Sequence, residues 1–456
     1  MHLNVECDML NSYNYELSIV NYFDGNKEED MSKEIKIDHI CRVEGHGGVT
    51  IDMERDIVNI EVFEGSRFFE FLVVGKSYQE IPSIVCRICA ICSISHMITA
   101  LMAIENAFGI QISRQTMLLR ELIHCGGMIE SHGLHLFCLA APDYLGVTSV
   151  ITLAEKEPEL ASMGLRLKKL GNKIQEIIGG GRPIHPINLC IGGFGMIPEK
   201  HELLVLKKEL EMAVDDGIKA VQFFSGIDVF PVEPAEYFSA LKPVNNKFGF
   251  FGESIRVSAG STPGNECEFE ISDYRSVCHE VVVEHSRAKH SHYNDKPFMV
   301  GALARIMLFG DMLYGKSKEA LTMTEITKNP LHNNLAQAIE LVYASQRCLL
   351  IIDELLDTQM KDETPPEFQP KACTGTAALE VPRGTLYHHY EFDENGKNIK
   401  TDIITPTAIN LANMERDVRG IVKSQKQDGI LDERAISTKV GMLLRAYDPC
   451  ISCSVH

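Results

Sequence analysis

Two Cys-x-x-Cys pairs stand almost at opposite ends of the chain. The first pair is Cys89 and Cys92, and the second is Cys450 and Cys453. Thiolates at this spacing can hold one metal ion from adjacent turns of backbone. Most of the polypeptide lies between the two pairs. If all four cysteines bind one centre, the fold must therefore bring its last residues back to its first quarter.

Composition predicts a soluble protein built as one very large domain or as two or three lobes. The chain has 456 residues, a net charge of −19 and 14 cysteines. The negative charge argues against binding to nucleic acid or to anionic lipid. Residues 1–33 do not resemble a secretory signal, and no segment reaches the roughly 18 uninterrupted apolar residues of a membrane span. We therefore expect a cytoplasmic location and reduced thiols.

The apolar pattern predicts a mainly α fold with small β-sheets, in the α+β class. Residues 1–33 show no clear period and are predicted to be an N-terminal arm. Alternating apolar residues predict a small β region over 34–66. Helical spacing with glycine and proline breaks predicts a bundle over 67–361, with a mixed insert near 226–300. Residues 370–456 are expected to hold a hairpin, helices and a metal-binding tail.

The hairpin is expected to follow the turn residues at 393–396. Its two strands are predicted over 379–390 and 399–404. Two helices, over about 408–424 and 431–446, are then predicted to lead into the second cysteine pair.

Spacing alone favours a structural zinc site for the four cysteines. Three features argue against that interpretation. The pairs are far apart rather than in one small ribbon, a histidine follows each pair (His96 and His456), and Arg87 precedes the first. A positive charge beside thiolates favours a reactive centre.

Four sequence motifs resemble the signatures of nickel–iron hydrogenase large subunits. They are RVEGH at 42–46, RICAICSISH at 87–96, VPRGTLYHHY at 381–390 and DPCISCSVH at 448–456. They stand in the family's order and span nearly the whole chain. The resemblance implies one large helix-rich hydrogenase domain over residues 34–456.

Two positions depart from common family patterns. Ala90 stands where the family usually has glycine, a change that removes no ligand. Ser131 stands where membrane-linked uptake members often carry aspartate. With the motif at 381–390, this resembles the cytoplasmic, multimeric branch that exchanges electrons with nicotinamide cofactors, deazaflavin or ferredoxin.

The resemblance implies a role for each cysteine. Cys89 and Cys450 would be terminal nickel ligands. Cys92 and Cys453 would bridge nickel to an iron that carries carbon monoxide and cyanide. Hydrogen has to be split heterolytically, so a nearby base must take a proton, and the family pattern gives this relay to Cys450 and Glu44.

Further roles come from the same resemblance. Arg383 and Thr407 would donate hydrogen bonds to the cyanides. A magnesium-type (or iron) site near the C-terminal histidine would use Glu70, His456 and the backbone carbonyl of Ile403. The residues expected to surround the ligands are His96, Arg87, Pro406, Thr407 and Asp448.

Electrons have no evident route through this chain alone. No nucleotide-binding glycine loop and no further iron–sulfur cysteine set is present. The resemblance implies an iron–sulfur small subunit, with flavin and NAD(P)-linked or ferredoxin-linked subunits beyond it. The ending at His456 resembles a mature form, which implies a maturation endopeptidase that removes a C-terminal extension.

Two alternatives remain open. One is a non-catalytic relative, the quinone-site subunit of respiratory NADH dehydrogenases, which shares this fold but lacks the full cysteine set. The other is a protein with a structural four-cysteine zinc site.

Overall fold

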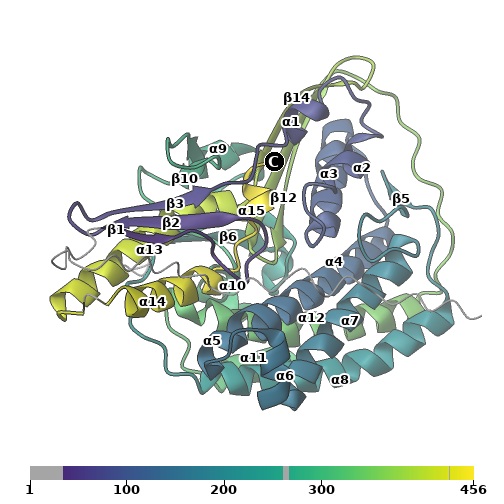
Figure 1. Cartoon of the computed structure of the whole chain (residues 1–456). Coiled ribbons are helices and arrows are strands. Elements are labelled where there is room, and N and C mark those ends of the chain that lie inside the picture. The colour runs from purple at the N-terminus through teal and green to yellow at the C-terminus, as the bar shows by residue number, and fades with distance from the viewer. Residues whose placement is uncertain (1–33, 260–265, 431) are drawn as a thin grey trace, which may run out of the picture. The chain divides into compact units, whose positions relative to one another are not determined.

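A computed structural model describes residues 34–259, 266–430 and 432–456. The N-terminal arm expected over residues 1–33 lies outside these described residues. The predicted fold class is confirmed, because the described chain is a helix-rich structure with small sheets (Figure 1).

Long helices lie side by side across the lower part of Figure 1, where α4 packs along α7 and α12, and α12 packs along α8. The long helices are α3 (Ser93–Phe108), α4 (Arg114–Leu134), α7 (Pro158–Gly179), α8 (Lys200–Ser225), α12 (Asn333–Asp357), α13 (Pro406–Gln427) and α14 (Glu433–Ala446). The shorter ones are α1 (Phe69–Leu72), α2 (Ile81–Val85), α5 (Ala141–Leu145), α6 (Val150–Lys156), α9 (Tyr274–Val277), α10 (Ala302–Phe309), α11 (Gly315–Thr322) and α15 (Ile451–Ser454).

The strands within the described ranges form five small sheets. All neighbours pair antiparallel except β11 and β6, which run parallel. In sheet order the strands are β1 (Glu34–Ile37), β2 (Gly47–Asp52) and β3 (Ile57–Val62); β4 (Leu189–Cys190) and β5 (Gly193–Phe194); β11 (Phe298–Met299), β6 (Tyr237–Pro243), β7 (Gly252–Ala259) and β8 (Glu266–Phe269); β10 (His290–His292) and β9 (His279–Val281); and β12 (Cys373–Val381), β13 (Gly384–Phe392) and β14 (Asn398–Ile404).

Local signals set the helix ends. The hydroxyl of Ser113 accepts the Thr116 amide at 3.0 Å and caps the start of α4. Pro158 occupies the first position of α7, where its missing N–H has no cost. Gly109 ends α3 with a left-handed φ of 70°, a conformation in which glycine meets little strain.

The hairpin prediction is wrong in one respect. Residues 379–390 were expected to form one strand, but β12 ends at Val381 and β13 begins at Gly384, with Pro382 and Arg383 as a two-residue turn between them. Gly384 has a φ of 137°, and a Cβ there would lie 2.4 Å from Val300 Cγ2. The backbone therefore turns where only glycine fits, and β12–β14 form a three-stranded sheet.

One helical segment among the described residues, Pro330–Asp357, is long and apolar enough to cross a membrane by length and composition. Within the fold 78% of its most apolar window is buried. A second candidate by the same test is the bent pair Arg114–Leu145 and Val150–Lys156.

Glycines let α4 and α7 approach each other closely. A Cβ on Gly171 would lie 2.4 Å from the backbone nitrogen of Glu130, and one on Gly126 would lie 2.7 Å from Ile174 Cγ2. The nearest atoms around Gly171 belong to backbone and cannot rotate away. This close helix contact therefore requires glycine at both positions.

We expect Gly171→Ala to lower the free energy of unfolding by about 1–3 kcal/mol, because the added methyl overpacks the helix contact. Gly420→Ala in α13 is the matched control, since nothing lies within 4 Å of its Cβ position. Alanine favours a helix over glycine, so the control should be neutral or stabilising. Chemical denaturation of both variants measures the difference, and equal stability would contradict the packing argument.

Candidate metal centre

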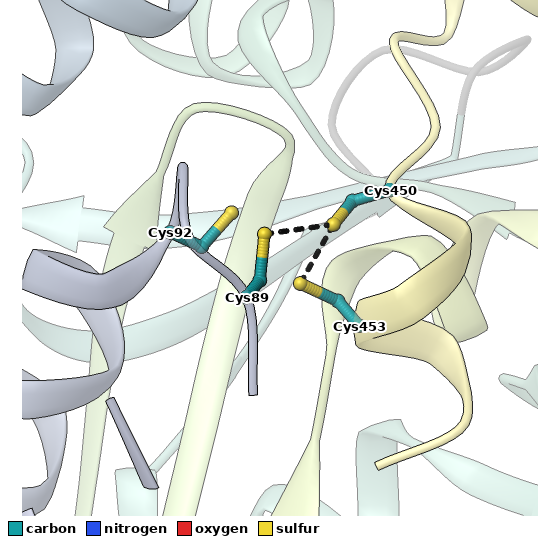
Figure 2. A group of neighbouring side chains, drawn as sticks. All are labelled: Cys89, Cys92, Cys450 and Cys453. Carbon is teal, nitrogen blue, oxygen red and sulfur yellow. Dashed lines mark hydrogen bonds between the residues drawn. The ribbon is translucent and has the colours of Figure 1, made fainter. Parts of the chain in front are cut away.

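The four predicted ligands converge in the structure. Cys89 precedes α3, and Cys92 stands at its N-cap position. Cys450 stands directly before α15, and Cys453 lies within it. Their sulfurs all lie within 4.8 Å of one another, with 3.4 Å between Cys450 and Cys89 and 2.8 Å between Cys450 and Cys453 (Figure 2). All four side chains are buried and none is in a disulfide.

The tail is seated on the turn that contains Glu44. The Ile451 amide donates to the Glu44 carbonyl at 2.9 Å, within a short parallel bridge between Glu44 and Cys450. Gly45 makes this approach possible. Its φ is 84°, and a Cβ there would lie 2.8 Å from Ile451 Cβ and 2.9 Å from the Ser452 nitrogen. The RVEGH motif is therefore the seat of the second cysteine pair.

The Glu44 carboxylate reaches the sulfur cluster directly. Cys450 Sγ donates to Glu44 Oε2 at 3.1 Å. The Ser452 amide donates to the same oxygen at 3.1 Å, and the Ser452 hydroxyl donates to Oε1 at 2.6 Å. The carboxylate is half-buried and connects a site sulfur with the edge of the tail.

Arg383 is a buried cation beside the cysteines. Its Nη1 donates to Cys92 Sγ at 3.2 Å, while Nε and Nη2 donate to the backbone carbonyl and carboxylate of Asp448 at 2.7 and 3.0 Å. Burial alone would lower the pKa of Arg383, but the negative charges of Asp448 and the cysteines raise it well above its usual value. Arg383 therefore stays charged.

A second buried arginine holds the turn that carries Arg383. Arg305 pairs with Glu340 and Glu380, and also donates to the carbonyls of Val381 at 3.0 Å and of Pro382 at 3.3 Å. The turn is therefore fixed from behind by an ion-pair network, and this support places the guanidinium of Arg383 at the cluster.

The sulfurs cannot all carry charge without a further cation. Hydrogen bonds from Cys450 and Cys453 hold the pKa of Cys89 well below its usual value. Burial raises the pKa of Cys450 and Cys453 well above theirs. Metal ligation requires deprotonated cysteines, so a bound cation would supply the charge that this buried set lacks.

A small cavity of about 10 Å³ adjoins the sulfurs and is lined by Arg383, Pro406, Thr407 and Thr405 among others. Thr407 Oγ1 accepts the Cys450 amide at 3.0 Å, which leaves its hydrogen free to donate. Thr405 is the N-cap of α13 but does not cap it, and its buried hydroxyl has no partner among the described residues. These donors fit a group with anionic ligands.

A hydrogen-bonded chain leads away from Cys453. Its sulfur lies 3.9 Å from His96 Nε2, His96 Nδ1 lies 3.1 Å from His388 Nε2, and His388 Nδ1 lies 2.6 Å from the Tyr390 hydroxyl. Burial lowers the pKa of His96 to about 3 and that of His388 well below its usual value. Both imidazoles are therefore neutral at physiological pH.

The structure also brings Glu70, Ile403 and His456 together. His456 Nε2 lies 2.7 Å from the Ile403 carbonyl and 3.9 Å from Glu70 Oε1. The same Glu70 oxygen accepts the Ile403 amide at 2.8 Å. Two oxygens and one imidazole nitrogen can hold a hard cation that keeps some water.

One expected neighbour lies outside the site. Arg87 is exposed, and its guanidinium donates to the Ser83 carbonyl and to Cys86 Sγ, 3.7 Å away. The side chain folds back along α2 instead of facing the four site cysteines. The expected placement of Arg87 beside the ligands is therefore corrected.

Several site residues were not identified from sequence. Ser452 holds Glu44, His388 and Tyr390 continue the chain from His96, and Thr405 lines the cavity. The motif letters at 381–390 and 448–456 include three of them. From the sequence, Thr405 before Pro406 indicates only the start of a helix.

Comparison with known proteins gives the family. The family described as "Nickel-dependent hydrogenase" matches residues 67–164 and 266–456, more than half of the chain. The chain belongs to the nickel-dependent hydrogenase family. The predicted family, fold and enzyme class are confirmed, and the chain is a catalytic large subunit. This family assignment also decides against the structural zinc protein.

Two curated relatives cover almost the whole chain. Sulfhydrogenase 1 subunit alpha of Pyrococcus furiosus is 41% identical over 92% of this chain and 97% of its own. NAD-reducing hydrogenase HoxS subunit beta of Cupriavidus necator is 28% identical over 93% of this chain and 95% of its own.

Solved structures show the same fold. An NAD⁺-reducing NiFe-hydrogenase in the H2-reduced state matches with a TM-score of 0.83 and 25% identity, over 93% of this chain and 100% of that one. A NiFeSe-hydrogenase of Dm. baculatum matches with a TM-score of 0.73 and 21% identity, over 93% of this chain and 99% of that one.

We expect Gly45→Ala to reduce the nickel content of the purified protein several-fold, because the added methyl collides with the tail that carries half of the sulfurs. Gly75→Ala is the matched control. Gly75 has a similar φ of 80°, but nothing lies within 4 Å of its Cβ position. Both variants have the left-handed strain of about 1–2 kcal/mol. Elemental analysis showing equal nickel in the two variants would contradict the seating role.

Proposed function

We propose that this subunit interconverts hydrogen with protons and electrons at a nickel–iron centre held by the four cysteines. The convergence of four buried, free sulfurs within 4.8 Å carries the proposal. Thiolates are soft, strongly donating ligands that suit nickel and iron. We assign Cys89 and Cys450 as terminal nickel ligands and Cys92 and Cys453 as bridges to iron, within one hydrogenase domain over residues 34–456.

Carbon monoxide and cyanide on the iron would lie on the side of the cluster that faces Arg383 and Thr407. Arg383 stays charged there, and Thr407 keeps a hydrogen to donate, so both suit anionic ligands. Pro406 adds an apolar wall without an N–H. Asp448 orients Arg383 through its carboxylate and backbone carbonyl.

Glu44 and Cys450 form the proposed proton relay. Nickel and iron would supply the heterolytic cleavage of hydrogen, which requires a nearby base for the proton. Cys450 Sγ already donates to Glu44 at 3.1 Å. Glu44 is half-buried, so its carboxylate can pass a proton outward from the buried sulfur.

The chain from His96 has one consistent direction when Cys453 is a metal-bound thiolate. A thiolate can only accept, so His96 Nε2–H donates to the sulfur and His96 Nδ1 accepts from His388 Nε2–H. His388 Nδ1 then accepts from the Tyr390 hydroxyl. All three donors point toward the bridging sulfur and polarise one another.

A magnesium-type ion (or iron) at Glu70, His456 and the Ile403 carbonyl is the second metal that we propose. The distances between these three groups support it. His456 Nδ1 also lies 2.8 Å from the Cys453 carbonyl, so the ion would hold the tail in place beside the cysteines.

The proposed partners follow from the cysteines, which offer no iron–sulfur ligand set among the described residues. Within the described chain, no cysteines other than the four site cysteines belong to a group that could hold a metal. Electrons therefore need an iron–sulfur small subunit. The relatives named as subunits of sulfhydrogenase and NAD-reducing hydrogenase favour flavin and NAD(P)-linked or ferredoxin-linked subunits and a cytoplasmic location. A maturation endopeptidase is a further proposed partner.

Infrared spectroscopy and elemental analysis test the centre together. We expect about one nickel per chain and the stretching bands of metal-bound carbon monoxide and cyanide. Cys450→Ser should lose most of the nickel, because a hydroxyl is a poor ligand for soft metals. Cys41→Ser is the control, since Cys41 is an exposed free cysteine. A wild-type protein without nickel or without these bands would overturn the proposal.

We expect Glu44→Gln to retain nickel and the infrared bands, while turnover falls about 10²–10⁴-fold because the amide cannot take a proton. Its carbonyl oxygen can still accept the Ser452 amide. Hydrogen-dependent dye reduction measures the loss.

Glu64→Gln is the matched control for the relay. Glu64 lies close by and bonds to His46 at 3.0 Å, yet contacts none of the cysteines. Its activity should stay near that of the wild type. Unchanged turnover in Glu44→Gln would remove Glu44 from the relay, whatever the metal content.

A further inference from the structure

A second group of metal-ligand side chains lies outside the sulfur cluster. His285 stands between β9 and β10, His290 begins β10, and Glu415 projects from α13. One ligand atom from each lies within 4.8 Å of the other two. Helix α13 packs on both β10 and β3, so the three residues meet where separate elements join.

Glu415 is a buried carboxylate, and no arginine or lysine of the described residues forms an ion pair with it. Its Oε1 accepts the Ile60 amide at 2.8 Å and lies 2.7 Å from His285 Nε2. Its Oε2 lies 3.9 Å from His290 Nδ1, which is too long for a hydrogen bond. Burial raises the pKa of Glu415. One oxygen therefore faces an imidazole without a bond between them.

His290 is almost wholly buried, at 2% exposed, and its Nε2 has no partner among the described residues. The ring nitrogen that faces Glu415 is the other one, Nδ1, so an ion bound there leaves Nε2 as it is. Burial lowers the pKa of His290 to about 4. The ring is therefore neutral at physiological pH, which is the form that binds metal.

The separations suit an ion between the ligands. Zinc bonds to nitrogen and carboxylate oxygen are about 2.0–2.2 Å long, so two atoms on one ion lie at most about 4.3 Å apart. The 3.9 Å between His290 Nδ1 and Glu415 Oε2 falls within that reach. A small shift of His285 would turn its Nε2 from the carboxylate to the ion.

We propose that His285, His290 and Glu415 bind a divalent transition-metal ion of the zinc type. Two imidazoles and one carboxylate are a zinc donor set, whereas calcium and magnesium prefer oxygen alone. The His285 side chain is 24% exposed, which leaves an entry path and a position for water. The ion ties α13 to the β9–β10 segment, and its role is structural.

The site is separate from the nickel–iron centre. Thr407, in the first turn of α13, lines the sulfur cavity. Glu415 follows it by about 12 Å along the helix axis. Loss of the proposed ion should therefore leave nickel, iron and the infrared bands in place, and the two proposals can fail independently.

Elemental analysis of the purified enzyme tests this site. We expect about one zinc per chain beyond the nickel and iron, lost in Glu415→Gln and His290→Gln. His279→Gln on β9 is the control, because His279 is an exposed histidine of the adjacent strand and should keep the zinc. A wild-type enzyme without such a third metal, or zinc retained in both site variants, would overturn the proposal.

A second measurement covers variants that fold poorly. His285→Gln changes the most exposed ligand and should disturb packing least. After chelator treatment of the whole enzyme, added Zn²⁺ should raise the Tm of the wild type and of His279→Gln but not of His285→Gln. An equal rise in all three proteins would show binding elsewhere and would refute the site.

Discussion

The hydrogen bond from the Ile451 amide to the Glu44 carbonyl is the contact on which the metal centre depends. It holds Cys450 and Cys453 next to a turn that lies far earlier in the chain, and it needs the missing side chain of Gly45. Half of the sulfurs arrive with this tail. Metal binding and tail docking are therefore linked, since a metal bound by all four cysteines stabilises only the state in which the tail is docked.

Charge explains why so much of the surrounding fold is polar and buried. Thiolates taken out of water need compensating cations. Arg383 supplies one, Asp448 orients it, and Arg305 holds the turn beneath it through Glu340 and Glu380. Such pairs are costly to bury, and removing one member strongly destabilises the protein because the other charge is left buried and unpaired. The network positions the donors, and the metals supply the remaining positive charge.

Sequence patterns predicted some parts of the molecule better than others. Helical periodicity and turn residues were sufficient for the long helices and for the fold class. The cysteine motifs identified all four sulfurs, because their spacing is local even though their meeting is not. Arg383 was found by motif, but the two-residue turn that aims it was not. That turn depends on close packing of Gly384 against Val300, which no local pattern reports.

Tertiary contacts also decide which of the surrounding residues reach the metal site. Arg87 is adjacent in sequence to the first cysteine pair, yet it points away from the site. Thr405, distant in sequence, lines the sulfur cavity, and His388 reaches the site through His96. Proximity along the chain is therefore a poor guide to which polar groups reach the ligands. Side-chain direction and neighbouring elements decide it.

Helix α13 joins these observations. Its first turn lies at the sulfur cavity, where the positive end of the helix dipole favours anionic sulfur and ligands. The Thr405 side chain does not cap the helix, and the Thr407 hydroxyl accepts the Cys450 amide. The polar side chains at this end therefore serve the cavity and the tail rather than the helix. A movement of α13 along its axis would displace the Cys450 backbone. The contacts of Glu415 with Ile60 and His285 oppose such movement, which gives the buried carboxylate a reason to lie on the same helix as the site.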